Sequence, residues 1–218
     1  TVFFLPRHGK GHSVPPHLVN YRANIYALRE LDVTHIVATN AVGSCRTEME
    51  AGHIVVPDQL IDSTVSRAST FFVGTSDEEM PAEFRTVQHT DVSYPYAGEV
   101  RQALLEALAV RDDITYHSAG TYVCNNGPRF ETAAEVNMAR LLGGHLLGMT
   151  SAPEAFLARE LGMDYATICL VTNYGAGMQD SISHEEVLEL FNERIEVVRD
   201  IILDCTSFLL LGKDGPKH

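Results

Sequence analysis

The chain has 218 residues, of which 45% are hydrophobic and 21% are charged. This composition is ordinary for a globular protein and excludes wholesale disorder, collagen-like repeats and coiled coils. The formal net charge of −13, from 16 basic and 29 acidic residues, argues against a general nucleic-acid-binding protein, which needs a basic face. The apolar runs fall short of the roughly 20 residues that cross a bilayer, and we find no signal-peptide pattern.

Short apolar strands alternate with amphipathic helices along the chain, which is the pattern of an α/β domain. The predicted strands are residues 34–39, 52–60 (with Pro57 at an edge or an end), 114–124 (interrupted at Gly120), 145–149 and 165–172. The predicted helices are residues 20–31, 96–109, one opened at Thr132, one at Ser151, and one from Ser183 to about Leu210. Three capping boxes, at 132–135, 151–154 and 183–186, mark helix starts. Residues 63–94 are predicted to form a long loop, which is uncommon unless it is functional or packs on a partner.

The cysteines stand at positions 45, 124, 169 and 205, with no CxxC motif and no spacing typical of a disulfide framework. We therefore expect buried free thiols and a cytoplasmic location. His8 and His12 have HxxxH spacing, but they lie in a glycine-rich turn rather than on a helix, so we expect no metal site. No Walker A, GxGxxG or GxSxG motif is present.

Polar and glycine residues cluster directly after the predicted strands, where open α/β sheets bind ligands. The five segments of this kind are residues 5–12, 39–44, 124–131, 148–150 and 172–177. In the first segment, Arg7 beside His8 and two glycines suits an anion, because arginine offers a bidentate fork and glycine lets backbone N–H groups approach. A solvated basic turn explains that segment equally well.

The other segments also have two interpretations each. Glu131 either accepts a hydrogen bond from a ligand, with Phe130 stacked on a flat ring, or only favours a helix dipole. Asn173 can both donate and accept, so it either contacts a heteroaromatic edge or is a turn residue. Residues 148–150 precede a helix N-terminus that either binds phosphate or is simply capped, and 39–44 either presents amides to a ligand or is a tight turn.

In their order and spacing, these segments resemble the trimeric family of purine nucleoside phosphorylases and methylthioadenosine phosphorylases over nearly the whole chain. The motifs are RHG, VNYRAN, TNAVGS, GPRFET, GMT-x-x-PE and VTN. The resemblance implies one domain with a mixed, twisted central sheet flanked by helices. It also implies phosphorolysis, in which phosphate attacks C1′ of a purine nucleoside and the free base leaves through an oxocarbenium-like state. Inorganic phosphate is the co-substrate, and the resemblance implies no cofactor and no metal.

The resemblance also implies roles for individual residues. Those implied to bind phosphate are Arg7, His8, Asn40, Ala41 and Thr150. Those implied to bind the base are Phe130, Glu131, Met149, Asn173, Tyr174 and Gly175. Those implied to contact the ribose are Met149, His184 and, from a neighbouring subunit, His89. Direct catalytic roles fall to Asn173, Glu131 and His8.

Three positions then discriminate within the family. Asn173 and Gly175 stand where adenosine-type enzymes resemble one another in carrying Asp, and an amide at 173 suits a 6-oxo group with N7. Glu131 stands where 6-oxopurine enzymes have Glu, and its carboxylate can accept from N1–H, which hypoxanthine and guanine carry and adenine lacks. His184 falls where those enzymes place a histidine against the ribose 5′-OH, although it could also be a solvent-facing residue of the third capping box.

The expected activity is therefore phosphorolysis of inosine or guanosine, as in purine salvage, closest to the 6-oxopurine and methylthioinosine branch. The alternatives are a methylthioinosine or methylthioadenosine phosphorylase, a hydrolytic nucleosidase and an inactive purine-binding protein. A trimer or a dimer of trimers is expected, with the loop at 63–94 in the interface. Residues 1–218 are expected to form one nucleoside phosphorylase domain that begins with a strand at 1–5 and lacks the family's amino-terminal Gly-Gly-Thr/Ser phosphate loop.

Overall fold

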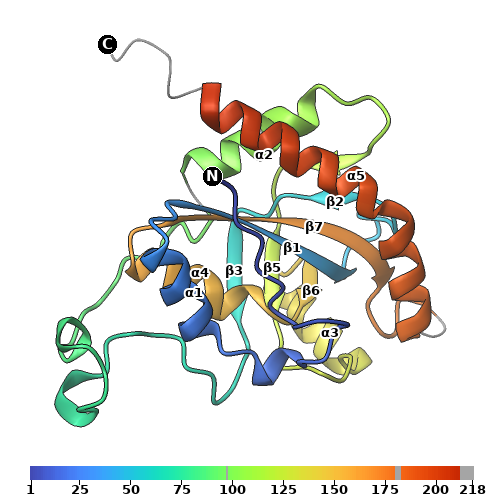
Figure 1. The fold of residues 1–218 in the computed structure, drawn as a ribbon. Helices are drawn as coiled ribbons and strands as arrows, with labels where there is room; N and C mark the ends of the chain where they lie inside the picture. Colours follow the sequence, from blue (N-terminus) through green and yellow to red (C-terminus); the bar gives the residue numbers. More distant parts are fainter. Residues whose placement is uncertain (97, 180–182, 212–218) are drawn as a thin grey trace.

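The computed structural model describes residues 1–96, 98–179 and 183–211, apart from the side chains of Ser76, His184, Glu186 and Leu211. Within these residues, seven strands form one sheet in the order β3-β5-β6-β1-β7-β2-β4 (Figure 1). The strands are β1 (His35–Ser44), β2 (Ile54–Val55), β3 (Gln59–Asp62), β4 (Tyr116–His117), β5 (Thr121–Cys124), β6 (Leu146–Gly148) and β7 (Asp164–Tyr174).

The two long central strands, β1 and β7, run parallel, and their pairing begins at His35 and Asp164. β6 is antiparallel to β1, and β2 is antiparallel to β7, whereas the outer pairs β3–β5, β5–β6 and β2–β4 are parallel. The predicted mixed sheet is therefore confirmed. An irregularity between Val42 and Gly43 shifts the β1–β7 register, so that Gly43 pairs with Asn173.

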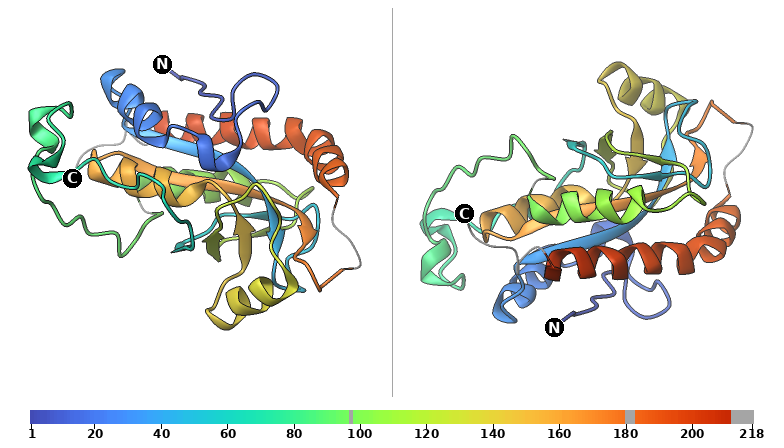
Figure 2. Two further views of the ribbon diagram at one scale, coloured as in Figure 1. Left: turned by 90° about the horizontal axis from the view of Figure 1, so that it is seen from below. Right: turned by 90° about the horizontal axis from the view of Figure 1, so that it is seen from above.

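Helices cover both faces of the sheet because β7 is apolar on both sides. Ala166, Ile168 and Leu170 pack with α2 and α5, whereas Cys169 and Val171 belong to the core that also contains α1 and α4. Figure 1 shows these two helix pairs on opposite sides of the sheet, and Figure 2 shows α2 and α5 side by side and α3 set apart at one end. The helices are α1 (Tyr21–Glu30), α2 (Glu99–Ala109), α3 (Ala133–Leu141), α4 (Ser151–Glu160) and α5 (His184–Leu211).

Several element boundaries differ from the prediction. β1 continues to Ser44, five residues past the predicted end, and the predicted strand at 52–60 divides into β2 and β3 around Pro57. The predicted strand at 1–5 is absent among the described residues, where this segment crosses the sheet between α1 and α5 (Figure 1). α2 begins at Glu99 rather than at Tyr96 because Gly98, with φ +86°, precedes it.

The predicted capping boxes have different outcomes. The first is confirmed, since Thr132 Oγ1 accepts from the backbone N–H of Glu135 and the Glu135 carboxylate accepts from that of Thr132. The second is wrong: α4 begins after Thr150, no side chain caps it, and Glu154 has other partners. The third cannot be assessed because it includes the side chain of Glu186, which is outside the described residues.

The long loop at 63–94 is confirmed, with two short 3₁₀ turns, η2 (Gly74–Ser76) and η3 (Ala82–Phe84). Phe71 is buried and stacks on Phe84, and Glu160 of α4 accepts hydrogen bonds from the Phe71 backbone and the Thr70 hydroxyl. The four cysteines are buried and free, as expected. Among the described helices, none has the length and apolar character that a membrane span needs.

Candidate active site

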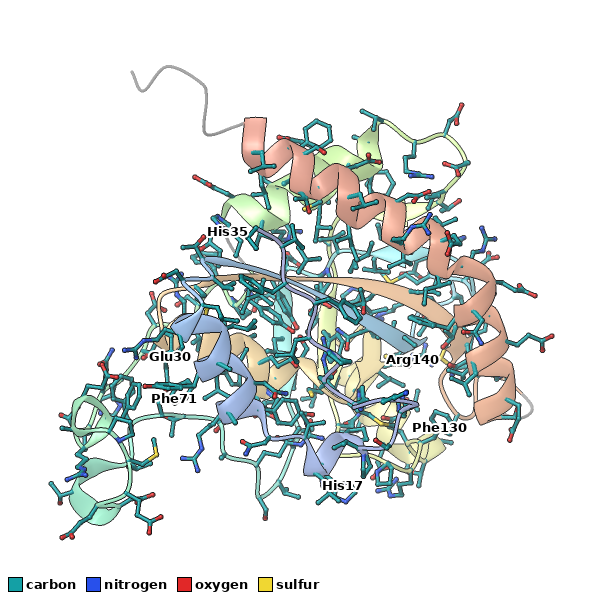
Figure 3. All side chains as sticks on the ribbon, in the orientation of Figure 1. His17, Glu30, His35, Phe71, Phe130 and Arg140 are labelled. Carbon is teal, nitrogen blue, oxygen red and sulfur yellow. The ribbon has the colours of Figure 1, made fainter. Side chains whose placement is uncertain are left out.

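A pocket of about 760 Å³ opens where β1 and β7 end. Its walls come from parts of the chain that are far apart in sequence: the amino-terminal segment, the central strands, the loop before α3, and α5. In Figure 3, Phe130 of the loop before α3 lies at this end of the sheet, and His35, at the start of β1, lies at the other. The lining includes residues 4–9, 39–43, 147–150, 172–173 and 187–188.

Arg7 is the centre of a buried polar cluster at one end of the pocket. Its Nη1 donates to Asn40 Oδ1 (3.2 Å) and Thr150 Oγ1 (2.8 Å), and its Nε lies 2.9 Å from a carboxylate oxygen of Glu154. Burial disfavours the charge, but the Glu154 carboxylate and the nearby tyrosines together outweigh it, so the pKa of Arg7 is raised. Ala41 lines the same pocket. The structure therefore brings these predicted phosphate residues together around a fixed cation.

A further layer of hydrogen bonds holds this cluster from behind. Asn40 Nδ2 donates to Thr167 Oγ1 (2.6 Å), and Tyr165 Oη donates to the second carboxylate oxygen of Glu154 (2.8 Å). Sequence reasoning missed Glu154 as a site residue because its spacing after Ser151 suggested a capping box. The available signal was its position. Glu154 is an acidic residue in the first turn of the helix that follows the polar strand-end segment at residues 148–150.

His8 is held by its own turn. Its Nδ1 lies 2.8 Å from the carbonyl oxygen of Val14. Because a carbonyl only accepts, Nδ1 carries the proton, and Nε2 of the neutral ring has the free lone pair. Burial lowers the pKa of His8, and its ring stacks on His12 at a centroid distance of 4.3 Å. Both histidines line the pocket, so His8 presents a neutral imidazole to it.

Asn173 lies beside the carboxyl end of β1, beyond Asn40, and Glu131 lines the same pocket. Asn173 pairs with Gly43, its Oδ1 accepts from Thr172 Oγ1 (2.9 Å), and its Nδ2 donates to the carbonyl oxygen of Tyr174 (2.8 Å). The Glu131 carboxylate accepts from Asn125 Nδ2 (2.7 Å), and burial raises the pKa of Glu131. A carboxylate that accepts and an amide that both donates and accepts thus line one pocket.

The remaining walls of this part are apolar. Phe130 and Met149 line the pocket, as the sequence suggested. Gly175 also lines it, and a Cβ at this position would lie 2.9 Å from side-chain atoms of both Leu147 and Val136. The flat ring and the thioether are side chains that can pack on a planar ligand, whereas Leu147 and Val136 fill the space beside Gly175.

Two predicted residues with described side chains, Tyr174 and His89, are not among those that line the pocket, and a third, His184, cannot be assessed. Tyr174 points away, since strand neighbours alternate between faces, and its Oη donates to the carbonyl oxygen of Thr47 (3.0 Å). The prediction that Tyr174 binds the base is therefore not supported. His89 is exposed on the 63–94 loop, and its predicted role in a neighbouring subunit stays a prediction. The side chain of His184 is outside the described residues.

Helix α5 supplies a wall that sequence reasoning missed. Val187, Leu188, Phe191 and Asn192 line the pocket from its first three turns. Their spacing of three and four residues was the available signal, but it is also the spacing of any helix that packs on a sheet.

Comparison with known proteins is consistent with this geometry. A profile of the phosphorylase superfamily matches residues 1–207. The chain belongs to this superfamily. It is 55% identical to the 6-oxopurine nucleoside phosphorylase of Pyrococcus furiosus over 93% of this chain and 75% of that protein. It is 49% identical to the probable S-methyl-5'-thioinosine phosphorylase of Methanothermobacter thermautotrophicus, covering 92% of this chain and 66% of the relative.

Phosphorylase superfamily structures also share the fold. The methylthioadenosine phosphorylase of Schistosoma mansoni in complex with adenine has a TM-score of 0.84 and 34% identity, covering 97% of this chain and 77% of that one. The family resemblance suggested by the motifs is therefore confirmed.

Proposed function

We propose that the protein is a 6-oxopurine nucleoside phosphorylase, which transfers the ribosyl group of inosine or guanosine to inorganic phosphate. The observation that carries this proposal is one pocket that combines the Arg7–Asn40–Thr150 cluster with Glu131 and Asn173. The name of the Pyrococcus furiosus relative supports it. The products are the free base and ribose 1-phosphate.

Phosphate binds at the Arg7 end. The guanidinium is held in one orientation by Glu154, Asn40 and Thr150, so little rotamer entropy is lost when an oxyanion arrives. Phosphate oxygens accept from Arg7 and from hydroxyl and amide groups of the cluster. The neutral His8 ring accepts from a protonated phosphate oxygen through Nε2.

The base binds between Phe130 and Met149, with its polar edge toward Asn173 and Glu131. The ionised Glu131 carboxylate accepts from N1–H of a 6-oxopurine. As the bond to C1′ breaks, negative charge builds on the leaving base, and the Asn173 amide stabilises it by hydrogen bonds at N7 and O6. Adenine lacks N1–H, so it would leave Glu131 without its partner.

The ribose is contacted by Met149, by His184, and by His89 of a neighbouring subunit in a trimer or a dimer of trimers. The exposed position of His89 on the long loop is compatible with contact to a second copy. A cytoplasmic location is proposed because the four cysteines are free thiols. The reaction uses phosphate as co-substrate and needs no metal or cofactor.

A second candidate is S-methyl-5'-thioinosine phosphorylase, which shares the base chemistry. The apolar side chains of Val187, Leu188 and Phe191 favour it, because a methylthio group prefers an apolar wall. The 49% identical relative from Methanothermobacter thermautotrophicus carries that name. Asn173 and Glu131 favour a 6-oxopurine base in both candidate functions. They therefore argue against methylthioadenosine as the substrate in either case.

The test is release of hypoxanthine from inosine and from methylthioinosine, each with and without phosphate, with guanosine and adenosine as further substrates. Phosphate-dependent release that is faster from inosine supports the proposal. Faster release from methylthioinosine would favour the second candidate. Release without phosphate would identify a hydrolase, and binding of hypoxanthine without turnover of any nucleoside would identify a purine-binding protein.

A further inference from the structure

Arg67 lies behind the pocket rather than in it. It belongs to the 63–94 loop, it is half-buried, and it is not among the residues that line the pocket. Its guanidinium lies over the ring of Tyr21, 5.3 Å from the ring centroid. The catalytic chemistry proposed above makes no use of this residue.

The guanidinium donates hydrogen bonds to oxygens of neutral groups. Nη1 donates to the carbonyl oxygen of Met149 (2.7 Å) and to Tyr21 Oη (3.2 Å). Nη2 donates to the carbonyl oxygens of Asn126 (2.6 Å) and Asn125 (3.4 Å). Arginine suits this task because its planar fork fixes several acceptors relative to one another.

These four acceptors lead to three walls of the pocket, since Asn125 and Asn126 belong to the same one. Met149 is itself a wall residue and precedes Thr150 of the phosphate cluster. Asn125 donates from its side chain to the Glu131 carboxylate (2.7 Å). Tyr21 Oη donates to the carbonyl oxygen of Pro16 (2.6 Å), which lines the pocket from the amino-terminal segment.

The same walls meet closely at Gly127. A Cβ at this position would lie 2.6 Å from Sδ of Met149 and 3.4 Å from Cγ of Pro16. The loop before α3 is therefore packed against both other walls with no room for a side chain. Because these contacts are van der Waals contacts between loops, polar links from behind are needed to maintain their spacing.

We propose that Arg67 is a positioning residue of the nucleoside site, a proposal that rests on the proposed function. One guanidinium joins the Met149–Thr150 wall, the Asn125–Glu131 wall and the Pro16 wall, and so sets the distance between the phosphate and the base. Without the Arg67 guanidinium, the catalytic side chains are all still present, but the distances between them change.

The test compares Arg67→Met and Arg67→Lys with Arg85→Met. Arg85 is a matched control because it lies on the same loop and also donates to carbonyl oxygens, those of Met80 (2.7 Å) and Glu78, within its own loop. We expect Arg67→Met to lower kcat/KM for inosine about 100-fold, mostly through kcat, because displacement of reacting groups by about 1 Å has that effect. Arg67→Lys should recover part of the loss, and Arg85→Met should stay within about twofold of the wild type.

Two readouts separate positioning from a merely structural role. A structural role would lower the melting temperature and the active fraction but leave the KM values and the preference for inosine over adenosine unchanged. A positioning role lowers that preference, because Asn125 orients Glu131. If Arg67→Met does not fold, Tyr21→Phe removes one link only and should lower kcat about fivefold, the value of one hydrogen bond.

Hydrogen–deuterium exchange of residues 124–131 provides a readout independent of activity. We expect faster exchange there in Arg67→Met than in the wild type or in Arg85→Met. Unchanged exchange together with unchanged kcat/KM and inosine preference in a folded Arg67 variant would overturn the proposal. If exchange is faster in Arg67→Met but the wild type phosphorolyses no nucleoside, the proposed function fails while the link between the walls stands.

Discussion

The two ends of the pocket are built differently. At the phosphate end, Arg7, Asn40, Thr150 and Glu154 are largely buried and hydrogen-bond to one another, so each side chain is fixed by other site residues. At the base end, the Glu131 carboxylate accepts a hydrogen bond from Asn125 of its own loop, and the Asn173 amide is held by residues next to it in the chain.

This difference indicates which end of the pocket tolerates substitutions during evolution. A substitution at the phosphate end disturbs several partners at once, including a buried charge pair, and is costly. A substitution at the base end alters one local hydrogen bond and one ligand contact. We therefore expect the phosphate end to define the reaction and the base end to define which purine is accepted.

The largest effect is expected at Arg7. In Arg7→Met, Glu154 stays buried without its cation, which should destabilise the fold by about 3–5 kcal/mol, and the lost charged hydrogen bonds should raise the phosphate KM about 100-fold or more. Thermal unfolding and phosphate-dependent kinetics measure both. The control is Arg29→Met, which loses an exposed ion pair with Glu83 and should leave the kinetics unchanged. A normal phosphate KM in folded Arg7→Met would remove Arg7 from the phosphate site.

A smaller effect is expected at Asn173. Asn173→Asp should lower kcat/KM for inosine by between about fivefold and 150-fold, and shift the preference toward adenosine, because a carboxylate accepts from a 6-amino group but cannot donate to O6. The new carboxylate would also face the Tyr174 carbonyl oxygen, which now accepts from the Asn173 amide. An unchanged ratio of inosine to adenosine turnover would show that Asn173 does not contact the base edge. Adding Gly175→Asp should not complete the switch, since Leu147 and Val136 fill that space.

The pH dependence of kcat/KM for inosine should show the ionisation of Glu131. The ionised carboxylate is a much stronger acceptor for N1–H than the neutral acid, and burial raises the pKa of Glu131. On acidification, kcat/KM for inosine should therefore fall at a higher pH than an ordinary glutamate would cause, and Glu131→Gln should remove that limb. Glu135→Gln is the control: Glu135 lies outside the pocket, and the Arg129 hydrogen bond lowers its pKa to about 2. An identical acid limb in Glu131→Gln would contradict the assignment.

The smallest effect is expected at Tyr174. Tyr174→Phe removes a hydrogen bond to the Thr47 carbonyl oxygen on the side away from the pocket. Kinetic constants should stay within about twofold, and stability should change by about 1 kcal/mol or less. A large loss of activity in this variant would restore Tyr174 to the base site.

The sequence predicted the strands, the helices and most of the pocket because strand-end motifs are local patterns. Asn40 lies on β1, Thr150 follows β6 and Arg7 lies on the amino-terminal segment, and the family resemblance of their motifs was enough to expect them in one site. Glu154 was misassigned because a capping box and a buried ion pair use the same residue at the same spacing, and only the partner 147 positions away decides between them.

Other features depend on contacts that no local pattern records. The α5 wall has the periodicity of an ordinary packed helix, so Leu188 and Phe191 carried no sign of a ligand. Arg67 is one of two arginines in a long loop, and three of its four acceptors are backbone carbonyls, which leave no trace in the side-chain sequence. Tyr174 was assigned to the site by family position, but the pleat of β7 faces it the other way.

The pairing of β1 with β7 determines how far apart Asn40 and Asn173 lie in the pocket. Asn173 stands opposite Gly43, three residues beyond Asn40, and each residue of a strand advances by about 3.3 Å, so the two asparagines are separated by about 10 Å. The distance between the bound phosphate and the bound purine thus depends on the number of β1 residues between Asn40 and Gly43. Deleting one residue from this stretch of β1 would shorten the span by a full step and turn the following side chains to the other face.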